Sequence, residues 1–487
     1  MARTGGPCRC PLKPGPGSAK GALARRVAWS AEADAATVGA TVLPPSSPLS
    51  SFRQVTEWMR RPYEFFASCQ AQFGDLFTLR IPVLGDVVIV ASPEHVKEVF
   101  AQSPEAAHAG EANVVLRPFL GDHSLLLLDG SPHLRHRRMM MPAFHGDRIA
   151  SYGASMLSMT DESIDRAPRG RPFAAHDLLQ DLTLRIILRT VFGVAEGARF
   201  TELATILAES LDVLAWPPML ASWMQTDLGP WSPWGKFVRL SRRADALLQA
   251  EIEEARAQSA AGRSDILSML LAARDEQGQG LTDLELKQEL VTLLVAGHET
   301  TATALSWALR WTLDDVTLRD RLVAEADRLV VAGGGTLDPA AVARSELLDG
   351  VVKEALRLVP VIPLVGRVMQ RPLTLGAYEL PVGTRVAPSI YLVHHRPELY
   401  PHAERFDPDR YRSFRPSSWE FIPFGGGFRR CIGASFAIAE MKMVLAQLFR
   451  RLTLRLAPGY RPRRTRRSIT ITPSEGLPVI AAARLAS

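Results

Sequence analysis

One cysteine, Cys431, stands near the end of a glycine-rich segment, FGGGFRRCIG, over residues 424–433. Arg429 and Arg430 precede it, and a helix-favouring apolar run follows over residues 434–449. The positive end of such a helix and the two guanidinium groups favour the thiolate form of a cysteine, which is the form that ligates metals. The three glycines of the segment let a flat ligand come close to the backbone, because glycine has no Cβ. The segment therefore predicts a metal or cofactor site at Cys431.

A second cluster of polar residues lies inside an apolar stretch, LVTLLVAGHETTATALSWAL, residues 290–309. A histidine and a glutamate are costly to place in a buried helix, so their presence calls for an explanation. Ala296 and Thr300 are four residues apart on one face, where the threonine hydroxyl can bond the Ala296 carbonyl and open room for a small ligand. Glu299 beside Thr300 offers a route for protons through water. A simple kink in the helix is the alternative interpretation.

Two shorter motifs place charges at helical spacing. Glu354 and Arg357 in KEALR are three residues apart and can pair on one face of a helix, although this spacing alone is usual for a surface ion pair. His133 and Arg137 in GSPHLRHRR share a helix face, and both side chains can donate hydrogen bonds to anions. A solvated basic helix is the alternative interpretation of the second motif.

In their order along the chain, these motifs resemble those of the cytochrome P-450 family. The pattern Phe-x-x-Gly-x-Arg-x-Cys-x-Gly over residues 424–433 is similar to the family's haem-binding loop, and AGHETT to its oxygen-binding groove. The resemblance covers nearly the whole chain from Leu43 onward. It implies a mainly α fold with small β-sheets, in one domain over residues 43–487, with haem between the oxygen-binding helix and the cysteine loop. Residues 1–42 are expected to be a disordered extension, although a transit peptide or an early start codon is an alternative.

The resemblance also implies roles for individual residues. Cys431 is the expected ligand of the haem iron, while Thr300 steadies dioxygen and Glu299 relays protons. A structural triad, which holds the chain behind the haem, is expected from Glu354, Arg357 and Arg410 of FDPDRY. The remaining expected haem contacts are His133, Arg137, Ala296, Arg367, Phe424, Gly427, Arg429 and Gly433. The expected substrate pocket is formed by Val115, Leu116, Phe119, Thr292, Val295, Ile362 and Leu364.

The resemblance implies monooxygenation with haem b, O2 and electrons derived from NAD(P)H through a separate ferredoxin and ferredoxin reductase. The apolar pocket predicts a lipophilic substrate, such as a fatty acid, a terpenoid or a steroid-like molecule, which is hydroxylated or epoxidised. Arg429, Arg430, Lys442, Arg135 and Arg138 are expected to form a basic patch for an acidic electron carrier. The alternatives are a peroxide-driven peroxygenase, a haem-thiolate isomerase, a haem-based sensor and, more remotely, a zinc or structural role for Cys431.

Composition agrees with a globular protein. The chain has 487 residues, of which 47% are hydrophobic and 22% charged, and its four cysteines do not form a disulfide framework. The net charge of +6 includes a basic run, RPRRTRR at residues 461–467, which we expect to be a solvated loop beside a hairpin rather than a nucleic-acid site. No apolar stretch approaches the roughly 20 residues that span a bilayer. We therefore expect a soluble protein in the cytoplasm, and the family resemblance implies a bacterial monomer.

The elements that must position these residues can be read from periodicity and turn signals. Two alternating apolar runs, DLFTLRI and DVVIVA, flank a turn signal at residues 84–86 and predict a β-hairpin. Ser92 and Pro93 then predict the first turn of a helix. Helical periodicity dominates residues 145–358, and a long proline-rich meander follows over residues 397–423. A loop of that length is tolerable where it wraps a cofactor.

Overall fold

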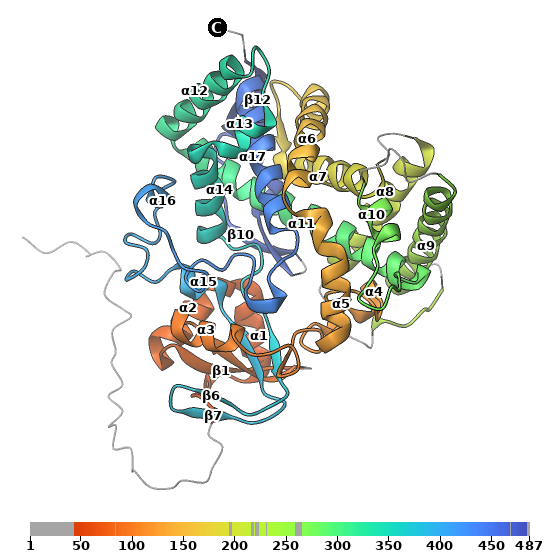
Figure 1. Cartoon of the computed structure of the whole chain (residues 1–487). Helices are drawn as coiled ribbons and strands as arrows, with labels where there is room; N and C mark the ends of the chain where they lie inside the picture. Colours follow the sequence, from red (N-terminus) through yellow and green to blue (C-terminus); the bar gives the residue numbers. More distant parts are fainter. Residues whose placement is uncertain are drawn as a thin grey trace, which may run out of the picture. The chain divides into compact units, whose positions relative to one another are not determined.

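The computed structural model describes residues 43–82, 84–193, 197–215, 219, 224–229, 231–258, 265–467 and 469–484. The predicted extension at residues 1–42 lies outside this described part. Helices dominate and the sheets are small, which confirms the predicted fold class. Figure 1 shows α11, Asp283–Asp314, running between the helices α8 to α10 on one side and the strands β1, β6 and β7 on the other.

The helices have these bounds: α1 Ser51–Arg60, α2 Pro62–Phe73, α3 Pro93–Phe100, α4 Arg117–Leu120, α5 Gly130–Met140, α6 Asp147–Arg166, α7 Ala175–Phe192, α8 Ala198–Ala215, α9 Pro233–Ala257, α10 Ile266–Ala272, α12 Val316–Ala332, α13 Pro339–Arg344, α14 Glu346–Leu358, α15 Ile390–His394, α16 Arg410–Ser413 and α17 Ala434–Arg451. Helix α11 is the longest of them, with 32 residues, or about 48 Å at 1.5 Å per residue.

The strands have these bounds: β1 Leu76–Ile81, β2 Gly85–Val90, β3 Ala107–His108, β4 Pro172–Ala174, β5 Arg367–Met369, β6 Leu373–Leu375, β7 Tyr378–Leu380, β8 Arg385–Pro388, β9 Leu452–Leu456, β10 Arg464–Arg467, β11 Thr470–Pro473 and β12 Pro478–Ala483. The largest sheet has five strands in the order β1-β2-β8-β5-β3. Its β1–β2 pair is antiparallel, with Leu76 opposite Val90, which confirms the predicted hairpin.

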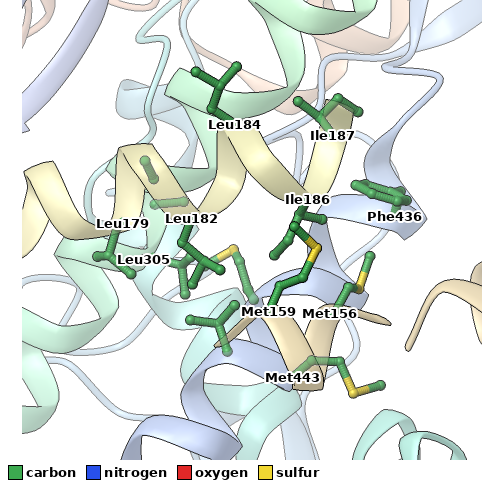
Figure 2. Close-up of a cluster of buried hydrophobic side chains, with 14 of the residues drawn as sticks. Met156, Met159, Leu179, Leu182, Leu184, Ile186, Ile187, Leu305, Phe436 and Met443 are labelled. Atoms are coloured by element: carbon green, nitrogen blue, oxygen red, sulfur yellow. The ribbon is translucent and has the colours of Figure 1, made fainter. Parts of the chain in front are cut away.

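Helix α7 packs against α11, α6 and α17 in the largest hydrophobic core. Figure 2 shows Leu182 of α7 beside Leu305 of α11, with Met156 of α6 and Met443 of α17 in the same cluster. All four side chains are at most 2% exposed. Each contributes roughly 1.5–3 kcal/mol through the apolar surface that it buries. This packing holds α11 against α7 and α17.

Local signals define the helix starts near the predicted site. Ser92 caps α3 by accepting a hydrogen bond from the His95 N–H, which confirms that prediction. Thr282 and Glu285 form a capping box at the start of α11, so both orphan donors there are satisfied. Helix α17 begins at Ala434, directly after the glycine-rich segment, as predicted.

The prediction for the basic run at residues 461–467 was wrong in part. Arg464–Arg467 is itself strand β10, paired antiparallel with β11, so the run forms one arm of the hairpin instead of a loop beside it. The Arg464 guanidinium lies 5.0 Å from the ring centre of Tyr63, and Arg466 lies 4.4 Å from that of Trp58. Two cations of this run, Arg464 and Arg466, therefore pack on aromatic faces, which is a stabilising arrangement. Among the described residues, no helix is both long and apolar enough to cross a lipid bilayer.

Candidate functional site

The Cys431 side chain lies at a concave site, where it is exposed to solvent but has protein around it. The Cys431 N–H donates to the Phe424 carbonyl at 2.9 Å, which closes the glycine-rich segment into a loop. The side chain is exposed to solvent. Burial nevertheless raises the pKa of the thiol, and the Gly433 N–H and the charges of Arg137 and Arg430 lower it by less. A side chain that is both exposed and embedded lies at a concave site. The predicted thiolate is therefore not favoured by the chain alone, and metal binding would have to displace the proton.

A second open surface lies in the middle of α11. Ala296 is exposed although Leu294 and His298 beside it are buried. The Thr300 hydroxyl donates to the Ala296 carbonyl at 2.6 Å, as its spacing predicts. Because the Ala296 carbonyl accepts a hydrogen bond from a side chain, the helix is loosened at this point. Exposure at the centre of a 32-residue helix means that this face borders a space inside the fold.

Four groups that bear or can bear positive charge influence one another near Cys431. Burial lowers the pKa of His133 to about 3, and Arg429, Arg137 and Arg367 lower it further. Burial and the charge of Arg429 lower the pKa of Arg367 to about 10. Burial likewise lowers the pKa of Arg137, while Cys431 acts in the opposite direction. The structure thus brings together the histidine and the three arginines that were predicted as haem contacts.

The positive charge of this group exceeds the negative charge beside it. Arg429 binds the Asp129 carboxylate and the Leu125 carbonyl, the latter at 2.9 Å. Arg367 donates to the carbonyl oxygens of Gly366 at 2.8 Å and of Gly426 at 3.3 Å, and it is 4% exposed. Within the described part of the chain, Arg137 has no ion-pair partner, and the buried atoms Nδ1 of His133 and Nε of Arg429 have no hydrogen-bond partner. Buried cations without counter-charges are costly, so these residues fit the two carboxylates of a haem.

Glycine is required at different positions of the loop for two different steric reasons. A Cβ on Gly426 would overlap the Phe100 ring, and one on Gly427 would overlap the Phe100 backbone. Gly427 also has a φ of +64°, which disfavours other residues. Gly433 opens on free space, because no atom lies within 4 Å of the place that a Cβ would take. At Gly426 and Gly427 the missing Cβ therefore makes room for Phe100, and the ligand contact expected of these glycines stays a prediction.

The residues expected to form a structural triad are in contact. Glu354 and Arg357 are both 0% exposed and pair through two hydrogen bonds of 2.8 Å. Arg410 Nε donates to Glu354 Oε1 at 3.3 Å, and the Tyr411 hydroxyl donates to Oε2 at 3.1 Å. The Asp407 N–H donates to Oε1 at 3.1 Å. One carboxylate therefore joins α14 to the meander.

Glu299 makes its contacts with α7 and not with Thr300. Its Oε2 accepts a hydrogen bond from Gln180 Nε2. Its Oε1 lies 3.8 Å from His176 Nε2. Gln180 Oε1 in turn accepts from Arg467 Nη1 of β10 at 3.1 Å. The sequence pattern on α11 offered no sign of these partners, because Gln180 and His176 precede Glu299 by more than a hundred residues.

The residues expected to line a substrate pocket are only in part free to do so. Thr292 is buried, and its hydroxyl bonds Ser124 Oγ and the Gln288 carbonyl, both at 2.7 Å. Phe119 packs edge-on against Trp234 and lies near Phe237, with ring centres 5.8 and 5.3 Å away. Half-buried positions are taken by Val115, Leu116, Val295, Ile362 and Leu364. A separate depression of about 920 Å³ borders Lys353, Tyr411 and Lys442 behind the triad, and it contains none of the expected pocket residues.

The expected basic patch is largely neutralised. Arg135 pairs with Asp275 and Glu285, at 2.7 and 3.0 Å. Arg138 pairs with Glu276 at 2.5 Å. Lys442 is 5% exposed and pairs with Asp349 at 3.2 Å, while Arg429 binds Asp129. Of the five cations, Arg430 is the exposed one that has no acidic partner among the described residues.

Sequence reasoning missed three acidic residues near the site. Asp129 immediately precedes α5, a position typical of a helix cap, but its carboxylate accepts from the Gly110 and Glu111 N–H groups at 2.8 and 2.9 Å and holds Arg429. Glu289 is fully buried and bonds His136 Nδ1 at 2.7 Å, which joins α11 to α5. Burial raises the pKa of Glu440 well above its usual range, and a hydrogen bond from Thr301 acts against this.

Comparison with known proteins places the chain in one family. The family model described as Cytochrome P450 matches residues 44–478. Cytochrome P450 135B1 of Mycobacterium tuberculosis is 42% identical over 416 residues, 85% of either chain. Cytochrome P450 135A1 of the same organism is 36% identical over 441 residues, 90% of this chain and 94% of the relative. The solved structure of retinoic acid bound cyanobacterial CYP120A1 superposes with a TM-score of 0.79 at 24% identity, over 91% of this chain and all of that one.

The solved structure is similar in fold, whereas the family model and the mycobacterial relatives identify the family. Its members are haem-thiolate enzymes, and the exposed thiol of Cys431 beside an excess of buried cations fits that cofactor. The chain belongs to the cytochrome P450 family and is an oxidoreductase of the monooxygenase type.

Proposed function

We propose that this protein is a haem b monooxygenase of lipophilic molecules, such as fatty acids, terpenoids or steroid-like compounds, which it hydroxylates or epoxidises. The observation that carries this proposal is the excess of positive charge from the half-buried Arg137 and the buried side chains of Arg367 and Arg429, beside an embedded but exposed Cys431. Such a site needs a ligand that combines two carboxylates with a metal. The apolar character of Val115, Leu116, Ile362 and Leu364 supports a lipophilic substrate.

In this proposal Cys431 ligates the iron, and the bound haem supplies the oxidising chemistry that puts one atom of O2 into the substrate while the other leaves as water. His133, Arg137, Arg367 and Arg429 hold the propionates. Ala296 leaves room on α11 because its side chain is a single methyl group. Thr300 offers its hydroxyl on the same face, where it can accept and pass on a proton, and Glu299 supplies that proton. Phe424, Gly427 and Gly433 would shape the loop that carries Cys431, and Glu354, Arg357 and Arg410 hold the meander to α14.

We propose that electrons come from NAD(P)H through a separate ferredoxin and ferredoxin reductase, and that the protein works as a monomer in the bacterial cytoplasm. A peroxide-driven peroxygenase is the second candidate. The exposed face around Thr300, with an acid next to it in the sequence, favours the monooxygenase, because stepwise proton delivery serves O2 and is not needed with peroxide.

The decisive experiment is the carbon-monoxide difference spectrum of the reduced protein. We expect the red-shifted Soret band of a thiolate-ligated haem in the wild type and its loss in Cys431→Ala. A folded, haem-loaded wild type without that band, or a variant that keeps it, would refute the assignment of Cys431. Turnover with peroxide but none with ferredoxin, reductase and NAD(P)H would favour the second candidate. A shift of ferric haem from low to high spin across a panel of lipids and terpenoids would identify the substrate class.

A further inference from the structure

Two buried polar atoms behind Thr300 face each other, and neither has a hydrogen-bond partner among the described residues. They are Oε1 of Glu299 on α11 and Nε2 of His176 on α7, and they lie 3.8 Å apart. His176 is 2% exposed. An unsatisfied buried polar atom costs about 1–3 kcal/mol, and here two of them point at one another. A rotation of the carboxylate would bring them to hydrogen-bonding distance, provided that one of the atoms carries a proton.

The other nitrogen of His176 shows which atom can carry it. His176 Nδ1 lies 3.0 Å from Ser306 Oγ. The Ser306 hydroxyl has one proton, which it donates to the Ala302 carbonyl of its own helix at 2.8 Å. The hydroxyl must therefore accept from His176, so Nδ1 carries the imidazole proton. In the neutral ring Nε2 is then a bare acceptor, and it faces a carboxylate oxygen that is also an acceptor.

The surroundings hold Glu299 in this place. Its second oxygen accepts from Gln180 Nε2, and Gln180 is itself oriented by the Arg467 guanidinium at 3.1 Å. Burial lowers the pKa of His176 to about 4, the charge of Glu299 raises it, and Arg467 and His298 lower it. A positive charge on the ring is therefore unfavourable unless Glu299 compensates it. If one proton is added between the two acceptor atoms, Oε1 of Glu299 and Nε2 of His176, they can form a hydrogen bond.

We propose that His176 is a positioning residue that shares one proton with Glu299, so that the pair stores a proton directly behind the Thr300 face of α11. When the proton leaves the pair toward the Thr300 side, the O–H or N–H bond that held it breaks. Glu299 is then a carboxylate stabilised by the Gln180 N–H, and a proton from water restores the pair. The proposal deepens the proposed function, because it rests on the role of Glu299 in proton delivery.

The first test measures the proton without turnover. In the reduced, carbon-monoxide-bound protein at pH 7, nitrogen-15 NMR of labelled histidine should show His176 protonated at Nδ1, and Nε2 either as a hydrogen-bonded acceptor or as protonated. In the acceptor case, infrared spectra should contain a carboxylic acid band that disappears in Glu299→Gln and in His176→Gln. A neutral His176 with its proton on Nε2, or a neutral His176 without that acid band, would overturn the proposal.

The second test uses turnover and a matched control. His176→Gln should lower the fraction of electrons that reach product, together with kcat, by about tenfold, within the range of general acid–base effects, and leave KM unchanged. In the Glu299→Gln background the same substitution should have no further effect, whereas a purely structural loss would add. Thr190→Ala is the control, because Thr190 is also buried on α7 and bonds the Ile186 carbonyl of its own helix.

The two tests separate two possible failures. If Glu299→Gln leaves turnover unchanged while the spectra show the shared proton, the proposed role of Glu299 fails and the shared proton stands. If Glu299→Gln impairs turnover and His176→Gln acts additively with it, the proposed role of Glu299 stands and the proposal for His176 is refuted. Equal losses in Thr190→Ala and His176→Gln would also refute it.

Discussion

Replacing Glu354 by glutamine tests whether one buried carboxylate holds the meander to α14. The substitution keeps the volume of the side chain but removes its charge. Arg357, which is 0% exposed, and Arg410, whose side chain is 8% exposed, would then remain as buried cations without a counter-charge. The new amide NH2 would also face the donors of Arg357, which now make two bonds of 2.8 Å to the carboxylate.

The expected loss is large compared with that of a surface pair. Removing one partner of a buried ion pair costs about 3–5 kcal/mol. With an unfolding entropy of about 2.1 cal/mol/K per residue, a domain of about 440 residues loses roughly 4 °C in melting temperature for 4 kcal/mol. Urea unfolding of the haem-loaded protein, followed by circular dichroism and by the Soret band, measures the change. We expect the release of haem to become faster in parallel, because the meander leads directly into the cysteine loop at residues 424–433.

Arg328→Gln is the matched control. Arg328 and Glu325 have the same three-residue spacing and also make two hydrogen bonds, of 2.8 and 2.7 Å, but Arg328 is 62% exposed. A pair whose cation lies in solvent is worth about 0–1 kcal/mol, so removing the exposed Arg328 should leave unfolding close to that of the wild type. If Glu354→Gln lies within about 1 kcal/mol of the wild type, or if both variants lose equally, the reasoning from burial is refuted.

Three further predictions follow from the site. Arg367→Leu removes a buried cation that lacks a carboxylate partner among the described residues, so it should stabilise the haem-free protein and weaken haem binding at least tenfold. Urea unfolding measures the stability, and haem transfer to apomyoglobin measures the binding. A variant in which stability and haem affinity both rise, or both fall, would contradict the assignment. Gly433→Ala should leave the haem-free protein unchanged and impair haem binding, whereas Gly426→Ala should destabilise both forms by its overlap with Phe100; haem titration of both variants decides this. Burial lowers the pKa of His395 to about 3, so the unfolded state binds one proton more between pH 6.5 and pH 3, and its contribution to stability is present above pH 6.5 and lost as the pH falls. When the pH falls from 7 to 5, the free energy of unfolding of His395→Gln, measured with urea, should therefore decrease by about 2 kcal/mol less than that of the wild type. An equal decrease in both proteins would contradict the prediction.

The elements that could be predicted from the sequence are those that depend on neighbouring residues. The cap at Ser92, the β1–β2 hairpin and the pair of Glu354 with Arg357 all follow from turn chemistry or from spacing along a helix. The bond from Thr300 to the Ala296 carbonyl belongs to the same class. Such features survive any tertiary arrangement, because the backbone geometry that creates them spans only a few residues.

The contacts that could not be predicted join residues far apart in the sequence. Asp129 and Arg429 are separated by 300 positions, and Asp129 looks like a helix cap until the fold brings the arginine to it. The basic run at residues 461–467 reads as solvated, because nothing in its own pattern reveals Tyr63 and Trp58 beneath its guanidinium groups. Burial also reverses a local expectation at Cys431, where desolvation outweighs the helix end and the neighbouring cations.

The buried groups without partners differ on the two sides of α11: one side has unpaired positive charge and donors, and the other has two facing acceptors. Each set therefore indicates which partner is missing. Near Cys431, three arginines and one aspartate leave buried positive charge and two nitrogens, on His133 and Arg429, without partners in the described part of the chain, so an anion is missing there. On the α7 side, two acceptors face each other across 3.8 Å, so a proton is missing there. A cofactor with carboxylates supplies the first and water supplies the second. A chain that keeps both deficits close to one helix is suited to combine a bound anionic cofactor with controlled proton delivery.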